Sequence, residues 1–132
     1  MTRRLPNWPH LLAAYIDATR FLVFRWGAND CCTFTAGAVL AITGRAVPLP
    51  AWSGRRDAVT TLRRMGGLRA ATTAQLGPMQ APAHAQRGDV VLLCQRGRSL
   101  LGVCLGHVWA APGAGGLAFG PMTEALGAWR VG

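Results

Sequence analysis

The residue with the clearest chemical potential is Cys31, which lies in the run Trp26–Phe34 just before an apolar segment. Asn29 or Asp30 can cap a helix that begins at Cys31. A cysteine in the first turn of a helix feels the positive helix end, which lowers the thiol pKa and favours the nucleophilic thiolate. Cys31 is therefore a candidate catalytic nucleophile. The alternative is a buried structural thiol, since free cysteines are among the most buried residues.

The other cysteines and the histidines form no pattern that would hold a metal ion. Cys32 points elsewhere on the predicted helix, so we expect it in the core. The chain has four cysteines and three histidines, with no C-x-x-C motif and no histidine at zinc-ligand spacing. The sparse cysteines, and an N-terminus without an apolar h-region, predict reduced thiols and no signal peptide. We therefore expect no metal site and no cofactor.

The elements that must position Cys31 are helices, which the pattern predicts across about residues 7–76. Asn7 can cap a first helix that reaches Phe21 and carries an apolar stripe. In a later helix Val59 and Leu62 are expected to face inward, with arginines outward. Helices are predicted over residues 7–21, 31–42, 55–65 and 70–76.

From about residue 88 to residue 131 the pattern changes to short strands. Gly and Pro residues punctuate apolar runs at hairpin spacing. Helices followed by short strands predict an α+β fold, with the N-terminal helices packed on one side of a small antiparallel sheet. A length of 132 residues with 51% hydrophobic composition suits a single domain spanning residues 1–132. Strands are predicted over residues 89–94, 100–105, 108–111, 117–119 and 128–131.

The surface is expected to be strongly positive, because the net charge is +9 and all 14 basic residues are arginine. Such a surface attracts nucleic acid, anionic polymers or acidic protein partners. The arginines are scattered and no strand carries interleaved aromatic residues, so no specific nucleic-acid binding is expected. A solvated or partner-facing surface is favoured instead. No apolar run approaches the roughly 20 residues of a membrane span.

Three motifs, in order along the chain, resemble the NlpC-type branch of the papain-like cysteine peptidases. Asp30–Phe34 is similar to the family's Asp-Cys-Ser-Gly motif, which carries the nucleophile at the start of a central helix. Gln86–Leu93 matches the family's Arg-Gly-Asp strand. Leu100–Gly106 is similar to its His-Val-Gly-Ile-Tyr-Leu-Gly strand, whose first residue is the catalytic base. The resemblance implies a papain-like (NlpC-like) fold with Cys31 at the nucleophile position.

This sequence departs from that family at the base. Leu100 occupies the position of the histidine, and the next strand, Val108–Ala111, lacks the family's third polar site residue. His107 is the candidate substitute base, but it lies seven positions after Leu100, roughly 24 Å along a straight strand. The alternative is a turn or surface histidine, and His10 and His84 are also expected to be exposed. A thiol without a base is a poor nucleophile at neutral pH.

Within that superfamily the chain resembles small proteins of phage and prophage tail gene clusters, through its Trp26–Cys31 run and its Trp129–Val131 ending. The resemblance implies a virion protein of the tail tip or baseplate hub, a pseudoenzyme that docks to hub or distal tail proteins. It would be found in the virion or, during assembly, in the host cytoplasm. The alternative is an active cysteine endopeptidase or amidase on cell-wall peptidoglycan that uses Cys31. A third hypothesis is an arginine-rich binder of anionic polymers.

Overall fold

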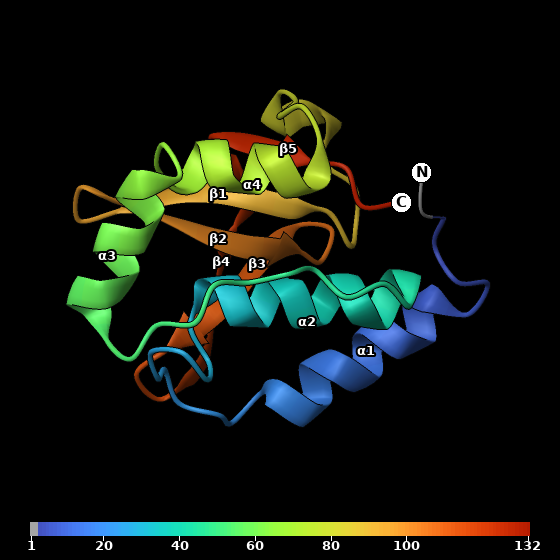
Figure 1. Cartoon of the computed structure of the whole chain (residues 1–132). Coiled ribbons are helices and arrows are strands. Elements are labelled where there is room, and N and C mark those ends of the chain that lie inside the picture. Colours follow the sequence, from blue (N-terminus) through green and yellow to red (C-terminus); the bar gives the residue numbers. More distant parts are fainter. Residues whose placement is uncertain (1–2) are drawn as a thin grey trace.

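The computed structural model describes residues 3–132, and over these residues four α-helices precede a five-stranded antiparallel sheet (Figure 1). This confirms the predicted α+β class and the order of helices before strands. The helices are α1 (Trp8–Thr19), α2 (Cys31–Thr43), α3 (Arg55–Arg64) and α4 (Leu68–Leu76). The strands are β1 (Val90–Gln95), β2 (Arg98–Cys104), β3 (Val108–Gly113), β4 (Gly116–Pro121) and β5 (Gly127–Trp129).

The first helix ends earlier than the sequence predicts. α1 stops at Thr19, and Phe21 is 81% exposed instead of completing an apolar stripe. The Asn29 side-chain amide donates hydrogen bonds to the carbonyl oxygens of Leu22 and Val23, which holds this segment in a loop. The apolar residues that follow α1 therefore lie at the surface. The predicted cap also fails, because Asn7 makes no side-chain cap hydrogen bond.

The third helix turns a different face inward from the one expected. Val59 is 40% exposed, whereas its neighbour Ala58 is buried. Leu62 packs against the core, as predicted. Ala58 and Leu62 are four residues apart and so lie on one helix face. The burial of Ala58 centres the inward face on that pair and leaves Val59 at its exposed edge.

The strands form one sheet in the order β4-β3-β2-β1-β5. β1 and β2 make a hairpin in which Leu92 lies opposite Leu101. β5 returns to pair with the free side of β1, so it forms the edge of the sheet opposite β4. The helices gather on one side of this sheet, with α2 running alongside it and α1 outside α2 (Figure 1).

The two faces of the sheet bury separate clusters. The helix-side cluster joins α1 and α2 to the sheet, and Tyr15 stacks on Phe34 with ring centroids 5.5 Å apart. The tyrosine hydroxyl donates to the Phe34 carbonyl oxygen at 2.8 Å, which fixes α1 against α2. The opposite cluster centres on Trp109 and Cys104. Three of the five tryptophans, Trp52, Trp109 and Trp129, are buried in these clusters.

An ionic clasp ties the first described residues to the sheet. The Arg4 guanidinium pairs with the buried Asp89 carboxylate at 2.9 Å. The same guanidinium donates to the carbonyl oxygens of Arg87 and Val131, each at 2.7 Å, and lies 4.2 Å from the ring centroid of Trp8. Because one side chain bridges the start of the chain, β1 and the segment after β5, the clasp closes the fold around the sheet.

Candidate functional site

Cys31 is the first residue of α2, and the helix start is fixed by Asp30 rather than Asn29. The Asp30 carboxylate accepts a hydrogen bond from the Thr33 N–H at 2.9 Å, and the Thr33 hydroxyl accepts one from the Asp30 N–H at 2.8 Å. This reciprocal capping box satisfies two backbone donors at the helix end. Gly44, in the left-handed conformation, ends the helix. The local sequence therefore puts a thiol at the positive end of a well-defined helix.

Asp30 also binds the loops on either side of Cys31. Its second carboxylate oxygen accepts from the Trp52 indole N–H at 2.7 Å and from the Gly27 N–H at 2.9 Å. The residue is only 1% exposed. One buried carboxylate therefore organises the helix start, the preceding turn and the segment that carries Trp52. This makes Asp30 a positioning residue for the site.

The Cys31 sulfur lies between a second thiol and strand β2, and it is partly exposed. A hydrogen bond donated by the Cys32 thiol lowers the pKa of Cys31, and a backbone hydrogen bond from Leu101 lowers it further. Burial and the neighbouring Asp30 carboxylate raise it, but the net direction of the Cys31 pKa is downward. The pKa of Cys32 is raised because that thiol is the hydrogen-bond donor and is buried. The thiolate of the pair therefore forms at Cys31.

The residue opposite Cys31 is Leu101, not Leu100 as the family pattern suggests. Leu101 belongs to the helix-side cluster, whereas Leu100 packs against the cluster on the other face of the sheet. Side chains alternate between the faces of a strand, so a shift of one residue exchanges the two leucines. The residue at the position of the family's base is therefore aliphatic in either register.

The structure brings none of the three histidines to Cys31. His107 is exposed in the turn after β2, beyond the end of the strand at Cys104. His84 ends a short 3₁₀ turn and His10 lies in α1, and both are exposed as predicted. The groups that act on the Cys31 pKa are thiol, backbone and carboxylate groups, with no imidazole among them.

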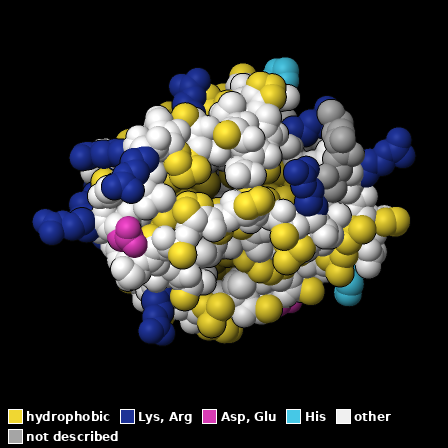
Figure 2. Space-filling model, in the orientation of Figure 1, with side chains coloured by type: hydrophobic (Ala, Val, Ile, Leu, Met, Phe, Trp, Pro, Cys, Tyr) yellow, Lys and Arg dark blue, Asp and Glu magenta, His cyan; other side chains and the backbone are white. Residues whose placement is uncertain are grey.

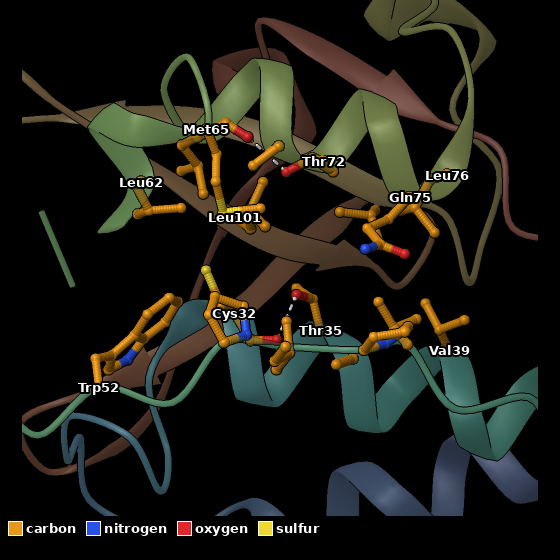
Figure 3. A pocket seen from close by; sticks show the side chains of 18 residues that line it. Cys32, Thr35, Val39, Trp52, Leu62, Met65, Thr72, Gln75, Leu76 and Leu101 are labelled. Carbon is orange, nitrogen blue, oxygen red and sulfur yellow. Dashed lines mark hydrogen bonds between the residues drawn. The ribbon is translucent and has the colours of Figure 1, made fainter. Parts of the chain in front are cut away.

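The sequence pattern did not reveal an apolar slot that runs beside α2 (Figure 3). It lies between α2 on one side and α3 and α4 on the other, with Leu101 on the sheet behind it. Cys32, expected only as core, directs its sulfur into this space (Figure 3). The slot has a volume of about 60 Å³. A second, more polar hollow of about 430 Å³ lies next to it, and Val39 and Leu76 line both.

The thiol pair yields a prediction about reactivity. The alkylation rate of Cys31 should follow a pKa below that of an ordinary cysteine, and Cys32→Ala should move the rate profile to higher pH because the donated hydrogen bond is lost. Cys32→Ser retains a hydroxyl donor and should move it less. The measurement is iodoacetamide alkylation against pH, with mass spectrometry to resolve each cysteine. The exposed Cys94 serves as the internal reference. Identical profiles for wild type and Cys32→Ala would contradict the assignment.

Residues 3–132 hold no group of three or more His, Cys, Asp or Glu side chains that could bind a metal ion. In the same part of the chain no helix is both long and apolar enough to cross a membrane.

Comparison with known proteins adds a family but no activity. No curated protein matches the chain. A family model described as a domain of unknown function, DUF6950, matches residues 3–131. The match runs from the arginine-rich start through α2 and the sheet to the residues after β5. The chain therefore belongs to the DUF6950 family of domains of unknown function.

Proposed function

We propose that this protein is a non-hydrolytic structural module with an NlpC-like, papain-like architecture. The observation that supports the proposal is the composition of the space around the Cys31 sulfur. The sulfur meets the Cys32 thiol and the backbone of Leu101, and no imidazole acts on it. Acyl transfer by a cysteine needs a base that can move a proton between nucleophile and leaving group. A helix dipole and a second thiol lower the pKa of Cys31 but supply no such base.

The proposed setting is the tail tip or baseplate hub of a phage or prophage, where the module docks to hub or distal tail proteins. The setting comes from the motif resemblance, and the surface is compatible with docking. Arginine side chains spread around the rim of one face, with hydrophobic side chains between them (Figure 2). Large apolar side chains are exposed, among them Phe21, Leu22 and Phe119. Arginine and aromatic residues, phenylalanine included, are enriched at protein–protein interfaces.

The second candidate function is a cysteine endopeptidase or amidase on peptidoglycan. The lowered pKa of Cys31 and its position at the start of α2 favour it. A low thiol pKa does not by itself separate the two functions, because the Cys32 thiol and the Leu101 backbone account for the shift. Loss of cell-wall turbidity is the discriminating readout.

The structural role can be tested in particles released after prophage induction of the strain that encodes the chain. We expect mass spectrometry to detect the protein in purified tails, and Cys31→Ser to enter particles as efficiently as wild type. The thiol has no part in the proposed docking, so the exchange should leave infectivity unchanged. Absence of the protein from purified tails, or loss of infectivity with normal incorporation of Cys31→Ser, would contradict the proposal.

A further inference from the structure

The segment that follows α1 holds three consecutive apolar side chains in solvent. Phe21 is 81% exposed, Leu22 51% and Val23 55%, and we call these three residues the apolar loop. Single exposed apolar residues are ordinary, but contiguous ones mark surfaces that contact proteins or membranes. Figure 1 shows this segment at the lower edge of the molecule, at the end remote from the C-terminus.

The backbone of the apolar loop is hydrogen-bonded within the protein. The Asn29 side-chain amide donates to the carbonyl oxygens of Leu22 and Val23, at 3.2 and 3.1 Å. The Leu22 N–H donates to the Thr19 carbonyl oxygen at 3.0 Å. Asn29 is itself buried. A buried amide therefore holds the loop with its polar backbone inward and its apolar side chains outward.

The β3–β4 hairpin holds the two ends of the loop. The Leu117 N–H donates to the Arg20 carbonyl oxygen, and the Phe24 N–H donates to the Gly113 carbonyl oxygen, each at 2.9 Å. The hairpin approaches so closely that a Cβ at Gly116 would fall 2.6 Å from the Arg20 carbonyl oxygen. The loop is therefore seated on the sheet.

This pairing distinguishes lipid from protein as the occupant. Hydrocarbon offers no hydrogen bonds, so a loop that enters it must have its backbone groups satisfied from within the protein. A partner protein can supply hydrogen bonds of its own and sets no such requirement. The internal partners of the Leu22 and Val23 carbonyl oxygens therefore favour a bilayer.

Cations flank the apolar loop on both sides. Arg20 precedes it and Arg25 follows it, both exposed, and positions 18–29 contain no acidic residue. The Arg20 guanidinium lies 5.8 Å from the ring centroid of Phe21. Long basic side chains keep their charge in the headgroup layer while their neighbours enter the apolar layer. The net charge of +9 adds a general attraction to anionic lipid.

We propose that the apolar loop inserts into the interface of an anionic bilayer, with Arg20 and Arg25 at the lipid phosphates. The binding is expected to be reversible, because one small apolar anchor is marginal and needs a basic surface as its second signal. This membrane contact goes beyond the proposed structural role and does not rest on it, since it involves neither Cys31 nor a tail protein.

The first experiment is co-sedimentation of the whole protein with vesicles of phosphatidylglycerol and phosphatidylcholine in equal parts. We expect binding to these vesicles and much weaker binding to phosphatidylcholine alone. Phe21→Asn should lower the affinity about tenfold or more. Leu126→Asn is the matched control, because Leu126 is 56% exposed but lies next to β5, at the edge of the sheet opposite β4. Both side chains are exposed, so both variants should keep the wild-type circular dichroism spectrum.

The role of the flanking charge is tested separately. Arg20→Gln should weaken binding about fivefold, the effect of one basic residue near an anionic surface. Arg130→Gln removes the same charge after β5 and should change binding by less than about twofold, because charges beyond a Debye length are screened.

Insertion is distinguished from adsorption by a fluorescent reporter. Phe21→Trp should shift the tryptophan emission to shorter wavelength when the anionic vesicles are added. Leu126→Trp should give no additional shift over wild type. This readout requires binding to be retained, so it does not depend on a variant that fails.

Several outcomes would overturn the proposal. They are no sedimentation of wild type with the anionic vesicles, equal losses for Phe21→Asn and Leu126→Asn, and no emission shift for Phe21→Trp. Poor incorporation of Phe21→Asn into tails, for a protein that does not bind vesicles, would also overturn it, because a protein partner would then cover the loop. None of these measurements involves the Cys31 thiol, so the proposed non-hydrolytic role is tested independently.

Discussion

Replacing Asp89 with alanine is expected to lower the free energy of unfolding by about 3–5 kcal/mol, the cost of removing one partner from a buried ion pair. Asp89 is 4% exposed, and its carboxylate binds the Arg4 guanidinium at 2.9 Å. It also accepts hydrogen bonds from the N–H groups of Gln86 and Val131. Alanine would leave these donors without their acceptor. Urea denaturation, followed by tryptophan fluorescence, measures the change.

The control variants test whether stability depends on the clasp itself or only on the net positive charge of the protein. Arg4→Ala should destabilise the fold strongly, because it leaves the buried carboxylate without its cation. Arg3→Ala removes the same charge from an exposed position and should change stability by less than about 0.5 kcal/mol. Similar losses for Arg3→Ala and Arg4→Ala would show that the clasp does not have the energetic role assigned to it.

The second large effect is expected for Asp30→Ala, which should lower the free energy of unfolding by about 2–4 kcal/mol. Loss of the helix cap accounts for about 1 kcal/mol. The buried Trp52 indole N–H, which donates to Asp30 at 2.7 Å, would lose its partner at a further cost of about 1–3 kcal/mol. Thermal and urea unfolding both measure the difference.

Asp57→Ala is the matched control for Asp30. Asp57 is also an acidic residue near the start of a helix, in the first turn of α3, and it accepts from the Ser53 N–H at 3.0 Å. It is exposed, so its loss should cost no more than about 1 kcal/mol. Equal destabilisation by Asp30→Ala and Asp57→Ala would mean that the buried contacts of Asp30 add nothing to an ordinary cap.

The start of α2 could be predicted from the sequence because its signals are local. An acidic cap three residues before Thr33, and a glycine after Thr43, define the helix without reference to the rest of the chain. The α+β class was predicted because the spacing of hydrophobic residues changes from helical to strand-like at about residue 88. This spacing is also a local signal. The end of α1 could not be predicted, because it depends on hydrogen bonds from Asn29, which lies ten positions further along the chain.

The identity of the residue facing Cys31 shows a second limit. A run of two leucines on a strand carries no information about which one faces the helices, because both are apolar. The β1–β2 register, with Leu92 opposite Leu101, decides it. The slot beside α2 is beyond sequence reasoning for a similar reason. Its walls come from α2, α3, α4 and β2, and only the packed structure brings Cys32 and Leu62 to the same space.

The central claim, that the domain does not hydrolyse cell walls, is tested most directly by the turbidity of purified peptidoglycan. Wild-type protein and Cys31→Ser should leave turbidity equally unchanged over a period in which lysozyme clears the suspension. Both proteins should show the same circular dichroism spectrum, so that a difference can be assigned to the thiol. Clearing by wild type but not by Cys31→Ser would contradict the account and establish Cys31 as a working nucleophile.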